Sequence, residues 1–216
     1  MLQPNSTART NGLGSTPRVV AIAMARSGWR ACGIDASRLQ IANARRKAGG
    51  ITPSPVFHVQ DMRKFRLQRK VGLATSFFDS LNHASSDRDL LRTFASVSRT
   101  LLPGGVFVFD LNTEHCFRTL WTNTGVVHHP DFTLILENHY SSARRRGNSL
   151  VTLFLRKGKT HREFGEIIEE RYFPDAAVRV FLAESGFEVL HLEEFNFTGR
   201  PEVGNIKSWW VARKRK

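Results

Sequence analysis

An acidic residue closes each of four strand-like apolar runs in this 216-residue chain, and helix-like segments stand between the runs. The four acids are Asp35, Asp61, Asp79 and Asp110. Apolar strands that alternate with helices predict an α/β fold with a mostly parallel sheet, because helices cover both faces of such a sheet. Ligands of these folds bind beyond the carboxyl ends of the strands. The acids therefore mark the edge of the sheet where a site is expected.

The spacing of apolar residues predicts where the helices and strands lie. Residues 87–102 carry Leu90, Phe94 and Val97 at helical spacing, and a Pro-Gly-Gly turn follows at residues 103–105. We expect further helices at residues 17–27, 37–47 and 175–185, and strands at residues 30–34, 55–60, 71–78, 106–109, 187–195 and 208–211. An antiparallel hairpin is expected at residues 132–138 and 149–156, on either side of a basic turn.

The length and composition suit a single domain. Domains of ~100–200 residues are usual, and 41% hydrophobic with 24% charged residues is ordinary for a globular protein. We expect residues 17–216 to form that domain, with a hairpin inserted at about residues 131–157. The polar residues 1–16 are expected to be a disordered or truncated segment.

The chain has no recognisable membrane or secretion signal. No apolar run approaches the ~18–20 residues that cross a bilayer, and the polar start lacks the apolar core of a signal peptide. We therefore expect a cytoplasmic location and no membrane partner. Cys32 and Cys116 lie far apart and are expected to be ordinary thiols, and no metal site is predicted.

The formal net charge of +13 is large enough to attract nucleic acid, a membrane surface or an acidic substrate. Much of the excess lies in short clusters at residues 69–70, 144–146 and 213–216. These clusters lack interleaved aromatic residues that would stack on bases. A solvated basic surface is the favoured interpretation, so nucleic acid is a partner that the charge allows but does not favour. The oligomeric state is left open.

Five segments, which follow one another along the chain in the family's order, resemble the class I methyltransferases that use S-adenosylmethionine. GIDAS at residues 33–37 is similar to the family's second strand and helix start, and FHVQDM at residues 57–62 to its third strand. LPGGVFVFD at residues 102–110 and SGF at residues 185–187 resemble later turns and strands, and SFFDSLNH at residues 76–83 resembles a subgroup that methylates small molecules. The resemblance covers roughly residues 17–213. It implies a Rossmann-like fold, with helices on both faces of the sheet and an antiparallel C-terminal hairpin.

The resemblance also implies how the cofactor, S-adenosyl-L-methionine, would be bound. Asp35 would bind its ribose, and Asp61 its adenine amino group with the Met62 backbone nearby. Phe77 and Phe78 would line the methionine and methyl end. We expect Asp35 and Asp61 to end neighbouring parallel strands and to face one cleft. From the residues alone, Asp35 can equally cap the following helix, and Phe78 can be ordinary core.

Three polar residues after the third of these acidic strands are the catalytic candidates. Asp79, Asn82 and His83 would orient the acceptor or take its proton. A loop histidine is more often structural, so this role for His83 is one of two interpretations. Gly14 is the candidate from the cofactor loop, since glycine lets the backbone approach a cofactor.

The start of the chain departs from the family pattern. Leu13, Ser15 and Pro17 stand where the family has glycines, and residues 1–10 contain no apolar run for a first strand. Three explanations compete: a truncated or misassigned start, a pseudoenzyme, and an active enzyme with an unusual cofactor loop. The stretch at residues 71–73 also lacks an acid that the family usually has there. The first explanation is favoured, because the body from residue 18 retains the strand-end acids and a plausible core.

The favoured function is methyl transfer to an oxygen or nitrogen of a small-molecule acceptor. The cofactor brings the reactive group, so the protein mainly aligns acceptor, methyl carbon and sulfur, with no metal required. The inserted hairpin would cover the acceptor, or simply extend the sheet. One alternative is a catalytically impaired interaction protein of the same fold. Another is an RNA methyltransferase, ranked lower because residues 76–79 are not of the Asn-Pro-Pro type.

Overall fold

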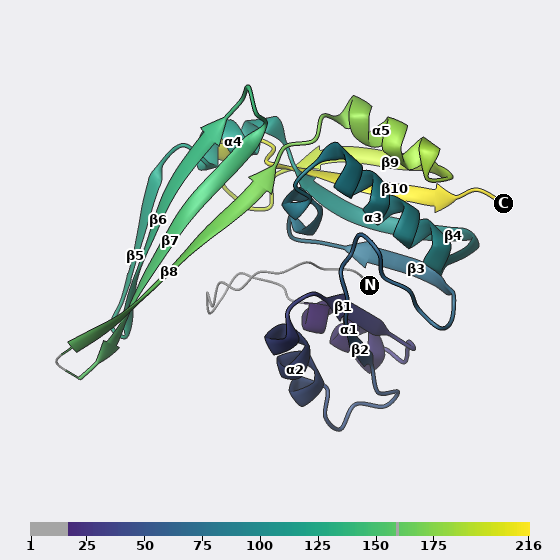
Figure 1. Ribbon diagram of the computed structural model, residues 1–216, viewed down its shortest axis with the longest axis horizontal. Helices are drawn as coiled ribbons and strands as arrows, with labels where there is room; N and C mark the ends of the chain where they lie inside the picture. The colour runs from purple at the N-terminus through teal and green to yellow at the C-terminus, as the bar shows by residue number, and fades with distance from the viewer. Residues whose placement is uncertain (1–16, 159) are drawn as a thin grey trace.

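A small parallel sheet begins the part of the chain that the computed structural model describes, residues 17–158 and 160–216 (Figure 1). Its elements are α1 (Pro17–Arg26), β1 (Cys32–Asp35), α2 (Arg38–Lys47) and β2 (Val56–Val59). The two strands pair in parallel. The Ser37 side chain caps α2 by accepting the N–H of Gln40. Ile41 of α2 and Phe57 of β2 are buried in one small core with α1 residues.

A four-stranded sheet forms the centre of the molecule. Its strands lie in the order β3 (Val71–Ser76), β4 (Leu101–Asn112), β10 (Lys207–Lys214) and β9 (Phe187–Phe195). β3 and β4 are parallel, whereas β10 is antiparallel to both β4 and β9. The connections include η1 (Ser80–His83), α3 (Asp87–Thr100), α5 (Asp175–Glu184) and η2 (Pro201–Val203). α3 and α5 cover one face of this sheet (Figure 1).

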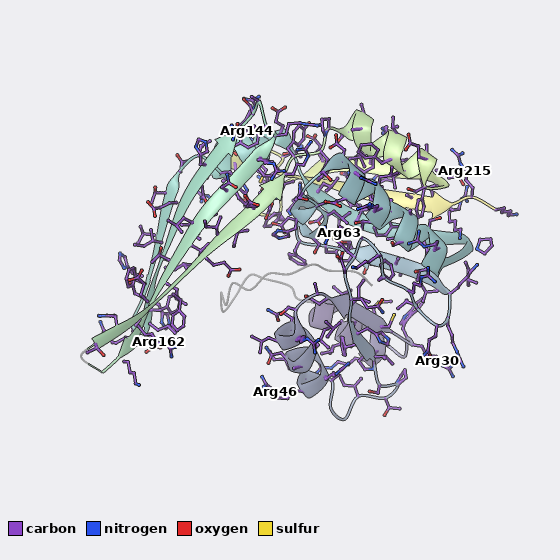
Figure 2. All side chains as sticks on the ribbon, in the orientation of Figure 1. Arg30, Arg46, Arg63, Arg144, Arg162 and Arg215 are labelled. Carbon is purple, nitrogen blue, oxygen red and sulfur yellow. The ribbon has the colours of Figure 1, made fainter. Side chains whose placement is uncertain are left out.

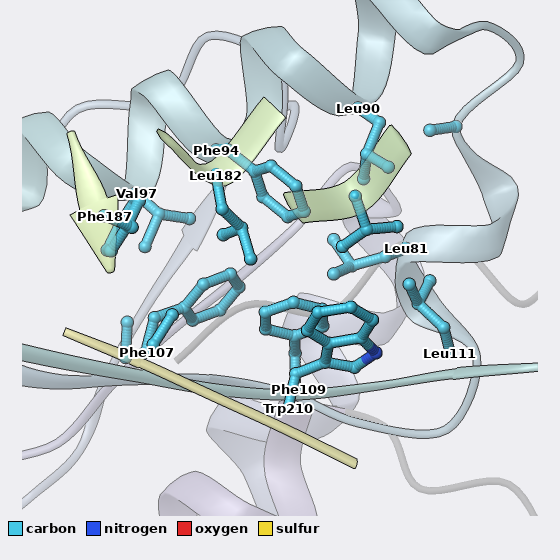
Figure 3. Packing of buried hydrophobic residues seen from close by; sticks show 14 of the residues in the cluster. Leu81, Leu90, Phe94, Val97, Phe107, Phe109, Leu111, Leu182, Phe187 and Trp210 are labelled. Atoms are coloured by element: carbon cyan, nitrogen blue, oxygen red, sulfur yellow. The ribbon is translucent and has the colours of Figure 1, made fainter. Parts of the chain in front are cut away.

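The main core lies between α3 and this sheet. Leu90, Phe94 and Val97 recur on one side of α3 and point at aromatic side chains of β4 and β10 (Figure 3). Phe109 and Trp210 stack with their ring centroids 5.8 Å apart. Each such side chain contributes about 1.5–3 kcal/mol when fully buried. The helical spacing of the sequence therefore fixes which face of α3 meets the sheet.

A second four-stranded sheet, the arm sheet, projects from the central sheet (Figure 1). It follows α4 (Glu114–Leu120) and consists of β5 (Thr124–His129), β6 (Phe132–Ser141), β7 (Arg146–Lys157) and β8 (Thr160–Arg171). All its neighbours are antiparallel. Asp87, at the start of α3, forms ion pairs with Arg145 and Arg171 at 3.2 and 3.1 Å. These pairs fix the root of the arm sheet against the central sheet.

The α/β class and each expected helix and strand are confirmed, with ends that differ by a few residues. The expected hairpin is present as β6 and β7, within a larger sheet. Among the described residues the expected single sheet is divided, because no described strand lies between β1 and β3. Ile34 of β1 nevertheless shares the main core with Ala74 of β3. Within residues 17–158 and 160–216, no helix is long and apolar enough to cross a membrane.

Candidate functional site

Asp35 ends β1 with one carboxylate oxygen bonded and the other free. Its side chain is 1% exposed. Oδ1 accepts the backbone N–H of Ser37 at 2.7 Å, whereas Oδ2 is buried and has no hydrogen-bond partner in the described part of the chain. Burial raises the pKa of Asp35 to about 6, against the opposing effect of the Ser37 N–H. A buried oxygen without a donor is costly, so this position is suited to a ligand that donates a hydrogen bond.

Two hydroxyl groups at the carboxyl end of β3 share this property. Thr75 and Ser76 are buried, and neither Oγ1 of Thr75 nor Oγ of Ser76 has a hydrogen-bond partner among the described residues. β1 is an edge strand of the small parallel sheet, and β3 is an edge strand of the central sheet. Three of the buried unpartnered polar atoms therefore lie at the strand ends where the cofactor was expected.

Asp61 lies just beyond β2, and its carboxylate is hydrogen-bonded to Arg63. Its carboxylate accepts the backbone N–H of Arg63 at 2.9 Å and the guanidinium at 2.6 to 3.1 Å. This hydrogen bonding holds the pKa of Asp61 below its usual value. Asp61 also lines an open pocket of about 520 Å³ with basic side chains, and Asp35 is not part of its lining. The two acids thus end neighbouring parallel strands as expected, but this pocket is not a cleft that both share.

The segment after β3 bends abruptly. The Phe77 ring stacks on Trp209 with centroids 5.0 Å apart, and Met62 packs against the main core. Phe78 is half exposed. Phe78 and Asp79 have left-handed backbone, with φ of 59° and 56°. Their N–H groups both donate to the carboxylate of Asp110, at 3.0 and 3.2 Å.

Three carboxylates surround one buried lysine at the end of the central sheet, and we call this group the acid cluster. It consists of Asp79, Asp110, Glu170 and Lys207. Lys207 Nζ lies 3.4 Å from Asp79 Oδ1 and 3.3 Å from Asp110 Oδ2. Burial, and then the nearby charge of Asp79, raise the pKa of Glu170 well above its usual value. Burial also raises the pKa of Asp110, which the charge of Lys207 opposes.

Asn82 and His83 are placed differently beside this cluster. Asn82 is fully buried, its Nδ2 donates to the Arg171 carbonyl at 2.8 Å, and its Oδ1 accepts the Asn112 N–H at 2.9 Å. His83 Nδ1 lies 3.1 Å from the Glu169 carbonyl. That contact favours the tautomer with hydrogen on Nδ1, because a carbonyl can only accept. Nε2 is then the acceptor nitrogen.

His83 also faces the acid cluster, because its Nε2 lies 3.9 Å from Glu170 Oε1. Its side chain is 21% exposed, so it reaches both the cluster and solvent. The structure therefore brings Asp79 and His83 to one place, while Asn82 links η1 to the arm sheet and β4. Gly14 lies outside the described residues.

Two members of the cluster could not be recognised from the sequence. Asp110 was visible as a strand-end acid, but Glu170 and Lys207 carry no local signal. Glu170 is the last residue but one of β8, a strand that was not expected. No sequence pattern marks this glutamate as part of a site. Its carboxylate reaches the site by accepting a hydrogen bond from Asn112 at 2.7 Å. Only the pairing of distant strands brings these residues together.

The positive charge is spread over the molecule rather than gathered at this site. Figure 2 labels arginines on the β1–β2 unit, beside α3, at both ends of the arm sheet and at the C-terminus: Arg30, Arg46, Arg63, Arg144, Arg162 and Arg215. Burial raises the pKa of the Cys116 thiol to about 12, so this cysteine stays neutral. The site itself is dominated by carboxylates.

The layers, the parallel strand pairs and the acids at their carboxyl ends define a Rossmann-like α/β protein with its site at the strand ends. A family model described as a methyltransferase domain matches residues 12–105. The putative methyltransferase YqeM of Bacillus subtilis (strain 168) is 26% identical over 200 residues, covering 91% of this chain and 80% of that protein. The chain is similar to these methyltransferases over most of its length.

Two further comparisons show the same similarity. A dTDP-3-amino-3,4,6-trideoxy-alpha-D-glucopyranose N,N-dimethyltransferase of Streptomyces venezuelae is 27% identical over 166 residues, covering 74% of this chain and 67% of that protein. The crystal structure of an S-adenosylmethionine-dependent methyltransferase from Clostridium acetobutylicum ATCC 824 superposes with a TM-score of 0.76 and 22% identity, covering 87% of this chain and 76% of that one. The latter supports the fold.

Proposed function

We propose that this chain transfers a methyl group from S-adenosylmethionine to an amine nitrogen of a small, sugar-like acceptor. The observation that carries the proposal is the acid cluster at the strand ends. The proposal is supported by the relative from Streptomyces venezuelae, whose name describes an amino-sugar nucleotide N,N-dimethyltransferase. It is also supported by a fold neighbour described as an amino pentose methyltransferase, with a TM-score of 0.63 and 19% identity.

In this proposal the free oxygen of Asp35 accepts a hydrogen bond from the ribose of the cofactor. The buried, unpartnered Oδ2 fits a hydroxyl donor, and an ionised carboxylate makes the stronger bond. Met62, Phe77 and Phe78 line the adenine and methyl ends, and Asp61 meets the adenine amino group once it parts from Arg63. When bound, S-adenosylmethionine supplies a methyl group on a positively charged sulfur.

The charge balance of the acid cluster favours an amine over a hydroxyl acceptor. Burial raises the pKa of Glu170 well above its usual value, which favours its protonated form. The charges of Asp79 and Asp110 then face only Lys207. One negative charge remains in a poorly solvated place, where a cationic amine is stabilised. A neutral hydroxyl gains much less there.

The acceptor nitrogen must give up a proton before its lone pair can attack. Asp79 binds and orients the ammonium group, and His83 takes the proton on Nε2, the nitrogen that faces Glu170. Glu170 is only 6% exposed, so the arm sheet excludes water on its side. A positioned base of this kind contributes about 10²–10⁴-fold to rate.

The test is transfer of labelled methyl groups from S-adenosylmethionine to a matched pair of acceptors, an amino sugar and the same sugar with a hydroxyl in place of the amine. We expect transfer to the amine and little to the hydroxyl. The His83→Ala variant should bind the cofactor as well as wild type and turn over at least tenfold more slowly. Transfer to the hydroxyl sugar alone would contradict the proposal. Failure to methylate the amino sugar and every other amine in a broad panel would contradict it as well.

A second function, an interaction protein that kept the fold without catalysis, is favoured by the divided sheet. Among the described residues β1 and β3 are not joined by a strand, and a cofactor would lie across that junction. Thermal unfolding with S-adenosylhomocysteine separates the two functions, because a ligand of the folded state raises the melting temperature. No shift at millimolar ligand would favour the second function.

A further inference from the structure

The chain leaves β3 through two successive left-handed residues. Phe78 has φ 59° and Asp79 has φ 56°, and both carry a Cβ atom. That atom lowers the population of left-handed backbone by roughly one order of magnitude per residue. Such conformations persist only where the surroundings hold them. The contacts of this turn should therefore include groups that hold it.

Asp110 contacts both strained residues. Its Oδ2 accepts the N–H of Phe78 at 3.0 Å, and its Oδ1 accepts the N–H of Asp79 at 3.2 Å. The residue lies inside β4, opposite Trp209 of β10, and is 6% exposed. A buried side chain on a paired strand has little freedom to move. Asp110 thus holds the two amides at fixed positions.

Lys207 supports this arrangement from β10. It is 5% exposed, and its Nζ lies 3.3 Å from Asp110 Oδ2 and 3.4 Å from Asp79 Oδ1. Asp110 faces the charges of Lys207 and Asp79, and the lysine opposes the rise in the pKa of Asp110 that burial causes. An ionised carboxylate can accept at both oxygens, whereas a protonated one must donate at one of them. The lysine therefore keeps Asp110 able to hold both N–H groups.

We propose that Asp110 and Lys207 are positioning residues that hold the Phe78–Asp79 turn in its left-handed form and so aim the Asp79 carboxylate at the acceptor. The part that concerns the acceptor rests on the proposed function. The part that concerns the turn does not. Neither residue needs to touch the acceptor or the cofactor, because each acts through the direction that it gives to Asp79.

The first test compares Phe78→Gly with Phe78→Ala. Both remove the same half-exposed ring, but only glycine adopts positive φ freely. Elsewhere alanine is the more stabilising of the two, because glycine gives the unfolded chain more freedom. At a strained left-handed position the order reverses. We expect the folding equilibrium constant from urea denaturation to be several-fold higher for Phe78→Gly, and an equal or lower value would overturn the proposal.

The second test adds Asp110→Asn to each of these variants. The substitution replaces one carboxylate oxygen by an NH2 group, which cannot accept an N–H, so one of the two bonds is lost and the turn is released. With Phe78→Ala, release lets the backbone relax and recovers the strain. With Phe78→Gly there is no strain at that residue to recover. Asp110→Asn should therefore lower the folding equilibrium constant about tenfold more in the Phe78→Gly background than in the Phe78→Ala background.

Equal costs of Asp110→Asn in the two backgrounds would overturn the proposal, since Asp110 would not be holding the strain. The cycle is repeated with Lys207→Met, which keeps most of the length of the unbranched side chain and removes its charge. That second cycle decides the matter if Asp110→Asn does not fold. Neither cycle needs a methyl donor, so each gives its answer even if the proposed function fails.

The third test is methyl transfer by the two double variants. Glycine still populates the left-handed turn after Asp110→Asn, whereas alanine leaves it. We expect the kcat of the Phe78→Gly, Asp110→Asn variant to exceed that of the Phe78→Ala, Asp110→Asn variant by about tenfold. Equal kcat values in an active protein would overturn the positioning role. If wild type transfers no methyl group to any amine, the proposed function fails, and the folding cycles still decide what holds the turn.

Discussion

Asp35 and Asp110 are both buried aspartates at the carboxyl ends of parallel strands, yet their surroundings differ. Asp110 accepts a backbone N–H at each oxygen and faces the ammonium group of Lys207. Asp35 accepts one N–H, from Ser37, and its second oxygen has no hydrogen-bond partner within the described chain. Position in the fold is therefore not enough to assign a role to a strand-end acid.

The two aspartates differ in whether both carboxylate oxygens have hydrogen-bond partners. A buried carboxylate with a partner on each oxygen stabilises the segments that donate to it. Removing one partner leaves the other buried groups without compensation. A buried carboxylate with a free oxygen costs stability until a ligand arrives. We infer that Asp110 organises the turn that carries Asp79, whereas Asp35 is kept available for the cofactor.

Replacing Lys207 should give the largest loss of stability. Lys207→Met leaves Asp79 and Asp110 without their shared counter-charge in a buried place, and breaking such a group costs about 3–5 kcal/mol. Arg213→Met is the matched control, because it breaks an ion pair with Glu188 at the exposed end of the same strand. The control should leave stability unchanged in urea denaturation. Equal losses for the two variants would refute the assignment of Lys207 to a buried network.

Asp35 should make the ligand-free protein less stable as pH rises from about 4 to about 6. Its pKa is about 6 in the folded chain and about 3.9 when unfolded, so the folded state holds the proton more tightly. Stability from this group is therefore greatest below pH 4 and is lost as the folded carboxyl ionises. The change should reach up to about 3 kcal/mol.

The Asp35→Asn variant isolates that contribution, since the amide keeps the size of the side chain and an oxygen for the Ser37 N–H. Urea denaturation curves for both proteins should converge near pH 4 and separate by pH 7, with the variant more stable at the higher pH. Other buried carboxyls affect both proteins alike. Curves that stay parallel across this range would show that Asp35 ionises without cost.

Arg63→Gln should give the smallest effect. The Arg63 side chain is 45% exposed, and its pair with Asp61 stands at the surface. Exposed pairs contribute about 0–1 kcal/mol, so urea denaturation should show little change. A loss above about 2 kcal/mol would mean that this pair belongs with the Asp110 network rather than with the surface.

The sequence predicts the elements best where packing is local. The Leu90, Phe94 and Val97 spacing is enough to predict α3, because the side of the helix that is buried repeats along the chain. β8 was missed, since its residues are mostly charged and exposed and show no apolar alternation. β4 begins before the Pro-Gly-Gly turn that was expected to precede it. There, pairing with β3 and β10 overrides the local signal.

The candidate site divides in the same way. Asp35 and Asp79 follow apolar runs, so their positions at strand ends could be predicted. Glu170 and Lys207 depend on contacts between residues far apart in the chain. Glu170 accepts a hydrogen bond from Asn112, 58 positions away, and Lys207 pairs with Asp79 and Asp110. No local pattern encodes such contacts. Equally, the sequence does not reveal that Asp61 is occupied by Arg63 while Asp35 keeps a free oxygen.

The most direct test of that contrast is calorimetric titration of S-adenosylhomocysteine into wild type, Asp35→Asn and Asp61→Asn at pH 8, where Asp35 is ionised. The account predicts that wild type binds and that Asp35→Asn weakens binding by about 1.5–3 kcal/mol, or roughly 10–150-fold, the scale of a hydrogen bond to a charged group. Asp61→Asn should weaken binding less, because that carboxylate is shared with Arg63. Equal affinities for wild type and Asp35→Asn would contradict the account.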